Sequence, residues 1–349
     1  MDARTLEFFA LAIVSALSIF AGYLTRERGW LHEDTSRKIH WFTIVVLWSA
    51  AGFFALWNLE PKIANLWVLG IEPLLVVIPA FLIIPLAKAI KLKRNQVGVL
   101  ALAAGLRNSG FALGAFLAYA ILPAGELLRQ QVGPDGTLAP DQVDALSISA
   151  LAYGLLIVMT MSMAVVIFLF PMVQHFAGDG ESGPGLGRII YKSFVDWKAM
   201  LFYSSAAGIA LAYLRVPVPS VVFDWYILKG LIFVGSAFAY FGIGMRLHFD
   251  HLRPHLKSHA ILAGVKFIAT PVLTIGLLLI ARNLGAAPPP PLLEQCFILI
   301  AFMPCAIQTV IVSNLFHLDA RMAGSVWITN TIVFVCLVLP VILLVVPRL

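Results

Sequence analysis

Charged and amide side chains interrupt long apolar segments of this sequence, and they are its best candidates for chemistry. Residues 105–114 read Gly-Leu-Arg-Asn-Ser-Gly-Phe-Ala-Leu-Gly and lie inside an apolar run. An intramembrane charge costs about 2.5 to 3.5 kcal/mol on insertion scales, so we expect Arg107 and Asn108 to face protein or water. Gly110 and Gly114 favour a break in the helix. Such a break would free backbone N–H groups that attract anions and carbonyls that hold cations.

A second polar break is predicted near the C-terminal end, where Pro304-Cys305-Ala306-Ile307-Gln308 interrupts another apolar run. Gln308 and Asn330 could join Asn108 in supplying amide donors and acceptors around one cavity. The same amides could instead act as hydrogen-bonded glue between helices. The candidate binding residues are therefore Arg107, Asn108, Gly110, Gly114, Pro304, Gln308 and Asn330.

Glu72 stands just before Pro73, and Lys266 stands five residues before Pro271, each in an apolar run. One interpretation is that the two residues form an ion pair that supports the binding residues; the other is that Arg107 or Lys266 offsets the negative charge of a bound anion. Other placements stay open at this point. Glu72 could lie at a membrane interface, and the long side chains of Lys266 and Arg107 could snorkel to the surface.

Composition places the chain among membrane proteins. The 349 residues are 60% hydrophobic and 12% charged, with a mean hydropathy of +0.93, which predicts a bundle of spanning helices. The net charge of +6 comes from short loops between apolar runs, so it indicates membrane orientation and no nucleic-acid partner. The cysteines lie in apolar runs and predict neither disulfides nor a metal site.

Four histidines, His248, His251, His255 and His259, recur at helical spacing. We interpret them as part of a solvated connector and expect no metal site there. The patterns typical of hydrolases and of nucleotide-binding loops are missing from the sequence, which argues against an enzyme and against an ATP-driven pump. No cofactor is expected.

Ten apolar stretches are long enough to cross about 30 Å of hydrocarbon. They lie at 5–25, 40–58, 65–89, 97–122, 146–174, 197–214, 223–246, 258–282, 293–316 and 322–346. The odd-numbered connections between these stretches lie on one side of the predicted membrane and carry 15 basic residues. The even-numbered connections and both termini lie on the other side and carry 7. The positive-inside rule therefore predicts an integral protein with both termini outside the cytoplasm. We expect its location to be the plasma (inner) membrane, although the sequence alone does not identify the membrane.

A glycine-rich stretch divides the ten predicted spans into five and five. We predict a first five-helix repeat over 1–177, a cytoplasmic linker over 178–195, and a second repeat over 196–349. An odd number of helices per half inverts the second repeat relative to the first. The charge-proline pattern recurs in spans three and eight, and the polar break recurs in spans four and nine. The predicted fold class is an all-α membrane protein of ten transmembrane helices in two inverted five-helix repeats, with helices 4 and 9 broken.

Short motifs occur in order along the chain. They are Ala21-Gly22-Tyr23-Leu24-Thr25-Arg26-Glu27-Arg28-Gly29-Trp30-Leu31, then Asn108-Ser109-Gly110-Phe111, then Pro304 with Asn314 and Asp319, followed by Asn330 and Pro340. In these motifs the sequence resembles the auxin efflux carrier family, a PIN-like group within the bile/arsenite/riboflavin-type transporter superfamily. The resemblance implies that the broken helices 4 and 9 cross. The chain departs from the family in having Ala115 where a proline is usual. Arg107 beside Asn108 is closer to the bile acid/sodium symporter family.

The resemblance implies an elevator-type secondary transporter that exports or exchanges a small organic anion, such as a carboxylate or an auxin-like compound. It also implies a binding site beside the crossing helices, supported by Glu72 and Lys266. Two alternatives stay open: a sodium- or proton-coupled symporter of bile-acid-symporter type, and a ligand-binding membrane receptor without flux. The sequence leaves the substrate, the direction of transport, the coupling ion and the choice between monomer and homodimer undecided.

Overall fold

The structure is a computed structural model, and it describes residues 3–109, 140–176, 187, 191, 195, 200–246, 255–284 and 288–345. Within these ranges the chain is nearly all helical and forms no strand, apart from one isolated bridge. In the first half the helical elements are α1 (Ala3–Glu27), α2 (Glu33–Phe42), η1 (Thr43–Trp48), α3 (Ser49–Trp57), η2 (Ile63–Leu66), α4 (Trp67–Ala89), α5 (Arg94–Gly105), α7 (Pro140–Ala164), η3 (Val165–Leu169) and α8 (Phe170–Gln174). In the second half they are α10 (Met200–Tyr213), α11 (Val221–Asp224), α12 (Ile227–Gly244), α13 (Leu256–Gly264), η6 (Val265–Ala269), α14 (Thr270–Leu284), α15 (Pro291–Ala301), α16 (Gln308–Leu315), α17 (Ala320–Val333), η7 (Phe334–Val338) and α18 (Leu339–Val345).

Six helical stretches within the described residues are long and apolar enough to cross a membrane. They are Asp34–Trp57, Ile63–Ala89, Ala145–Gln174, Ile227–Gly244, Leu256–Leu284 and Ala320–Ile342. The prediction of an all-α membrane protein is confirmed at this level. Of the other predicted spans, 5–25 corresponds to α1 and 197–214 to α10, and 293–316 covers α15 and α16. The span 97–122 begins with α5 and then leaves the described residues. Ten spans in two inverted repeats stay a prediction.

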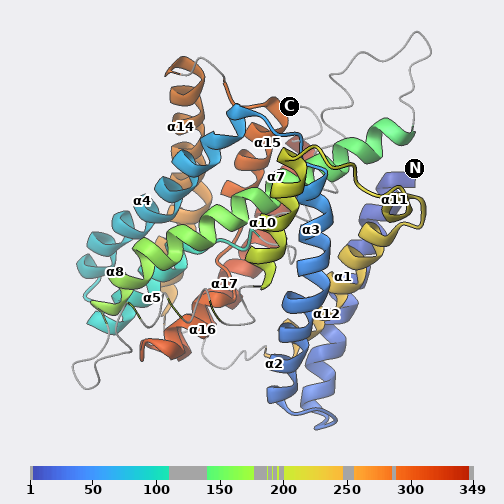
Figure 1. The fold of residues 1–349 in the computed structure, drawn as a ribbon. Coiled ribbons are helices and arrows are strands. Elements are labelled where there is room, and N and C mark those ends of the chain that lie inside the picture. Colours follow the sequence, from blue (N-terminus) through green and yellow to red (C-terminus); the bar gives the residue numbers. More distant parts are fainter. Residues whose placement is uncertain are drawn as a thin grey trace.

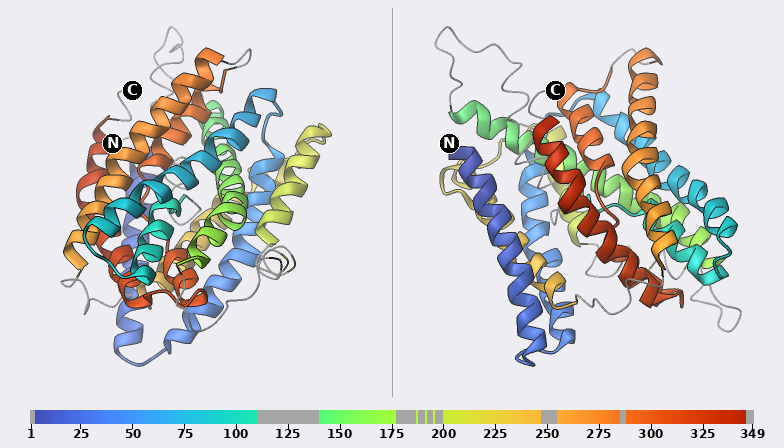
Figure 2. Two further views of the ribbon diagram at one scale, coloured as in Figure 1. Left: turned by 90° about the vertical axis from the view of Figure 1, so that its left-hand side faces the viewer. Right: turned by 180° about the vertical axis from the view of Figure 1, so that it is seen from behind.

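The helices form two groups that lie side by side (Figures 1 and 2). The α1–α12 group contains α1, the continuous stretch α2–η1–α3, α10 and α12. The α4–α17 group contains α4, α5, α7, α8, the stretch α13–η6–α14, and α15 to α18. Contacts between α3 and α7 join the groups. The first turn of α1 and the last turn of α18 lie at the same end of the molecule (Figure 2).

Glycines allow helices of the α1–α12 group to approach closely. A Cβ atom on Gly244 would lie 2.0 Å from the carbonyl oxygen of Ile19, and one on Gly22 would lie 2.1 Å from that of Phe241. Both contacts join α12 to α1. Gly208 has the same role where α10 meets α3, because its Cβ would lie 2.4 Å from a backbone oxygen of α3. Small residues at helix contacts are typical of membrane bundles, in which backbones pack closely.

The two halves of the chain make reciprocal contacts. α1 of the first half packs against α12 of the second, and α10 of the second half packs against α3 of the first. In the same way α5 packs against α17, and α15 packs against α7. The last helical stretch of each half also contains a π-helical turn, η3 in one and η7 in the other. The predicted linker at 178–195 lies almost entirely outside the described residues.

Candidate functional site

Two helices end at the same place, deep inside the α4–α17 group. α5 ends at Gly105, and Leu106 adopts extended backbone angles of φ −83° and ψ 120°. α15 ends at Ala301, and α16 begins six residues after Phe302, at Gln308. A longer side chain at position 105 would not fit, because its Cβ would lie 2.9 Å from the carbonyl oxygen of Val76. Both predicted breaks are therefore present in the described residues.

The extended segments after these helices run antiparallel and pair through their backbones. Asn108 N donates to Pro304 O at 2.8 Å, and Ala306 N donates to Leu106 O at 3.3 Å. The pairing makes the isolated bridge between Arg107 and Cys305. The pairing supplies hydrogen-bond partners for backbone groups that the helix break leaves without intrahelical ones. Buried backbone N–H and C=O groups need such partners. The two breaks thus form one crossing, and we call residues 106–109 and 302–307 the crossing segments.

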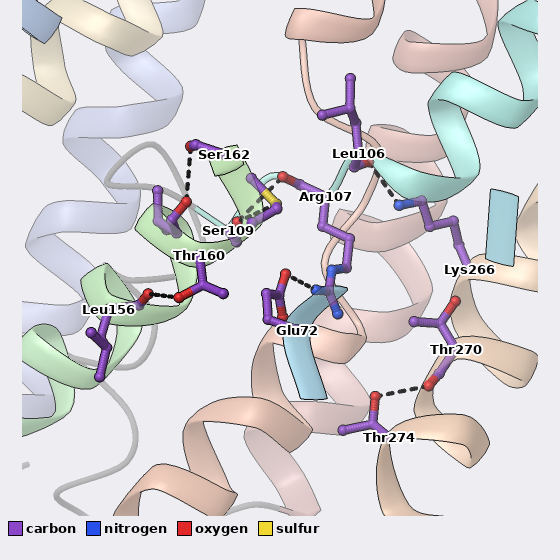
Figure 3. Close-up of polar contacts among 12 residues, drawn as sticks. Glu72, Leu106, Arg107, Ser109, Leu156, Thr160, Ser162, Lys266, Thr270 and Thr274 are labelled. Carbon is purple, nitrogen blue, oxygen red and sulfur yellow. Dashed lines mark hydrogen bonds and ion pairs between the residues drawn. The ribbon is translucent and has the colours of Figure 1, made fainter. Parts of the chain in front are cut away.

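Arg107 and Glu72 form a buried ion pair at this crossing (Figure 3). Arg107 Nη2 donates to Glu72 Oε1, and their side chains are fully buried. Arg107 therefore does not snorkel to the surface, and Glu72 does not lie at an exposed interface. Glu72 is carried by α4, whose three internal prolines are Pro73, Pro79 and Pro85. α4 packs against both α5 and α14, which brings the carboxylate to the end of α5.

Lys266 reaches the same crossing from the other side. It lies in the π-helical turn η6 and is fully buried, and its Nζ donates to Leu106 O at 2.7 Å (Figure 3). Thr270 Oγ1 donates to Val265 O at 2.8 Å within the same turn. π-Helical turns occur often at functional sites, because they turn a side chain away from the regular helical register.

The predicted ion pair between Glu72 and Lys266 is wrong, since the ion-pair partner of Glu72 is Arg107. Lys266 binds a backbone carbonyl instead. The physical reason is the end of α5. The last carbonyls of a helix carry a partial negative charge and lack intrahelical donors, so they attract an ammonium group. The charge of Lys266 still interacts electrostatically with those of Arg107 and Glu72.

Four of the remaining predicted site residues lie within the described part of the chain, and they divide into three kinds. Asn330 is buried, and its Oδ1 accepts a hydrogen bond from Cys305 N at 2.7 Å, so it holds one crossing segment in place. Pro304 is buried and Asn108 half-buried, and they pair through their backbones. Gln308 is exposed at the start of α16. The predicted residues Gly110 and Gly114 lie outside the described residues.

Several buried polar atoms near the crossing have no hydrogen-bond partner among the described residues. They are Glu72 Oε2, Arg107 Nε, Arg107 Nη1, Thr309 Oγ1 and Asn330 Nδ2. Buried polar groups in native proteins are nearly always hydrogen-bonded, to protein or to another molecule. This local concentration is therefore the strongest sign of a binding site in the described part of the chain.

Sequence reasoning missed three contributors to the site. The carbonyl of Leu106 holds Lys266, and Ser109 Oγ lies 3.2 Å from Met161 Sδ on α7. Thr309 follows Gln308 and is fully buried. The signal for Ser109 and Thr309 was present, since both are small polar residues in or next to a predicted break. Nothing in the sequence marks the carbonyl of an apolar leucine.

One histidine differs from the predicted solvated connector. His259 is only 7% exposed, and its Nε2 lies 3.2 Å from Ser325 Oγ. It belongs to α13, which packs against α17. His248 and His251 lie outside the described residues. In the part of the chain that the structure describes, no three His, Cys, Asp or Glu residues are grouped so that they could hold a metal ion.

Fold and composition together indicate an integral membrane protein built from helices, in whose interior the charged segments that follow α5 and α15 pair with each other. No protein-family model matches the chain, and no curated protein matches its sequence. The resemblance to the auxin efflux carrier family therefore stays a hypothesis, carried by the short motifs of the sequence.

Proposed function

We propose that the protein is a secondary transporter for a small organic anion, which it exports or exchanges by elevator-type alternating access. The observation that carries this proposal is the charge of the crossing. Two cationic side chains, Arg107 and Lys266, meet one carboxylate, Glu72, and the three are fully or almost fully buried. In their ionised forms they leave one positive charge in excess. A buried excess charge is costly unless a counter-ion joins it.

The backbone of the crossing also favours an anionic ligand. Interrupted helices at membrane depth are tolerated where they are buried in protein or line a cavity, and in known transporters they mark the substrate site. Here the carbonyl of Leu106, which could hold a cation, already accepts from Lys266 Nζ and Ala306 N. The crossing is thus better suited to an anionic ligand than to sodium.

The arrangement of the helices suits alternating access. The crossing belongs wholly to the α4–α17 group, and the α1–α12 group lies beside it (Figure 1). Reciprocal contacts between the halves are those expected of inverted repeats, which alternating-access carriers use to reach two equivalent states. Movement of the α4–α17 group against the α1–α12 group would carry a bound anion across the membrane.

A flux assay in proteoliposomes tests the proposal. We expect a carboxylate from a panel of varied size to move down its own gradient, without a requirement for sodium or a pH gradient. Uptake that depends on sodium or protons would instead favour a symporter of the bile-acid-symporter type. Ligand binding in detergent without flux across the panel would contradict transport and favour a receptor.

A further inference from the structure

The ion pair between Arg107 and Glu72 uses only part of the hydrogen-bonding capacity of either side chain. One guanidinium nitrogen, Nη2, binds one carboxylate oxygen, Oε1. Arg107 Nε and Nη1 and Glu72 Oε2 have no partner among the described residues, and all are buried. Arginine and carboxylate groups usually pair through two parallel hydrogen bonds. Arg107 and Glu72 therefore keep two donor nitrogens and one acceptor oxygen that are available to another molecule.

The spare groups have a definite polarity. Arg107 Nε and Nη1 and Asn330 Nδ2 are donors only, Glu72 Oε2 in the ionised form is an acceptor only, and the hydroxyl of Thr309 can do either. A hard cation such as Ca²⁺ takes six to eight oxygen ligands, and this set offers only two oxygens, those of Glu72 and Thr309. Acceptor oxygens on a ligand would satisfy the N–H groups, and a hydroxyl or N–H on the same ligand would satisfy Glu72 Oε2.

We infer that Arg107 and Glu72 form a two-ended recognition site for a carboxylate that also carries a hydrogen-bond donor, such as a 2-hydroxycarboxylate. The inference rests on the proposed function for the location of the site, and it goes further by naming the substrate class. Arg107 binds the carboxylate of the ligand through its remaining N–H groups. Glu72 holds the guanidinium through Nη2 and accepts from the donor of the ligand through Oε2.

The two residues have separable roles. The guanidinium is a planar fork that matches a carboxylate, whereas a lysine at the same position would keep the charge and lose the fork. Glu72 sets specificity, because a site built to hydrogen-bond a substrate hydroxyl discriminates strongly against the analogue that lacks it. Glu72 also competes with the ligand for Arg107. Substitution Glu72→Gln should therefore reduce discrimination without weakening the binding of a simple carboxylate.

Equilibrium binding to the purified full-length protein in detergent tests this inference. The probes are three matched pairs that differ by one hydroxyl: lactate and propionate, malate and succinate, and mandelate and phenylacetate. The three pairs differ in size, so that the test does not depend on one ligand volume. In the wild type we expect the hydroxylated member of at least one pair to bind about tenfold more tightly than its partner.

The variants have different expected signatures. Glu72→Gln should bring the two members of that pair within about twofold, while the simple carboxylate binds as well as before or better. Arg107→Lys should weaken both members by about tenfold and keep their ratio. A thermal unfolding curve for each variant shows whether it is folded. If a variant does not fold, the ratio of affinities for the hydroxylated and the simple carboxylate in the wild type still tests the inference.

Equal affinities within every pair in the wild type would overturn the inference, and so would an unchanged ratio in folded Glu72→Gln. These results are distinct from failure of the proposed function. Discrimination in binding without flux would leave the recognition site standing and reject transport. Flux without discrimination would leave transport standing and reject the role of Glu72.

Discussion

A double-mutant cycle, in which Glu72 and Arg107 are replaced separately and together, measures the coupling energy of the buried ion pair at the crossing. The substitutions are Glu72→Leu and Arg107→Met, which remove charge and keep similar volume. Because both side chains are fully buried, each single variant leaves an uncompensated charge inside the protein. Breaking a buried pair in this way costs about 3 to 5 kcal/mol.

The double variant should behave differently from the sum of the single ones. Replacing a buried ion pair by apolar residues of similar volume is often neutral or stabilising. We therefore expect a coupling energy of about 3 kcal/mol or more between the two positions. At about 2 °C per kcal/mol for a large chain, each single variant should lower the unfolding temperature by roughly 6 to 10 °C, and the double variant should recover most of that loss.

Thermal unfolding in detergent, followed by tryptophan fluorescence at one fixed scan rate, gives the comparison. The matched control is a second cycle with Glu72→Leu and Lys266→Met. Since Lys266 binds the carbonyl of Leu106, its coupling to Glu72 should be the smaller of the two. A larger coupling in the control cycle would refute the pairing described above and restore the one that the sequence suggested.

Three further outcomes are expected. Lys266→Ala should abolish anion flux in a folded protein, whereas Lys62→Ala, which removes a surface lysine paired with a glutamate, should leave flux unchanged; persistent flux without Lys266 would contradict its role. Asp319 caps α17, so Asp319→Ala should lower the free energy of unfolding by about 1 kcal/mol. Burial alone would raise the pKa of Asp319, but hydrogen bonds from a backbone N–H and from a glutamine lower it. The contribution of Asp319 to the free energy of unfolding is thus present above the pKa of the unfolded state and lost as the pH falls through the pKa of the folded state. The difference in unfolding free energy between wild type and Asp319→Ala should therefore disappear in acid. Gly244→Ala should destabilise the contact of α12 with α1 by about 1 to 3 kcal/mol, because the new Cβ would lie 2.0 Å from a backbone oxygen; Gly230→Ala on the same helix, with nothing within 4 Å, should leave the unfolding temperature unchanged or raise it.

The helices could be predicted from the sequence with good accuracy, because apolar length is a local property. The predicted stretch 258–282 corresponds to Leu256–Leu284, and 65–89 corresponds to Ile63–Ala89. Both breaks were also predictable, since Asn108 and Pro304 are out of place inside regular apolar helices. The depth of Arg107 was not predictable, because a long side chain in an apolar run can either snorkel or be buried.

Sequence alone determined that this chain is a helical membrane protein with two polar interruptions and with charged residues inside its apolar runs, among them Glu72, Arg107 and Lys266. Only the tertiary structure decided that Glu72 pairs with Arg107, that Lys266 binds a carbonyl, and that Gln308 is exposed. The reason is geometric. Which charges meet depends on how α4, α5 and η6 are rotated and where they cross, and residue 72 lies 35 positions from its partner. A sequence pattern shows which charged groups fall inside apolar runs, whereas packing decides how deeply each one is buried and which group it meets.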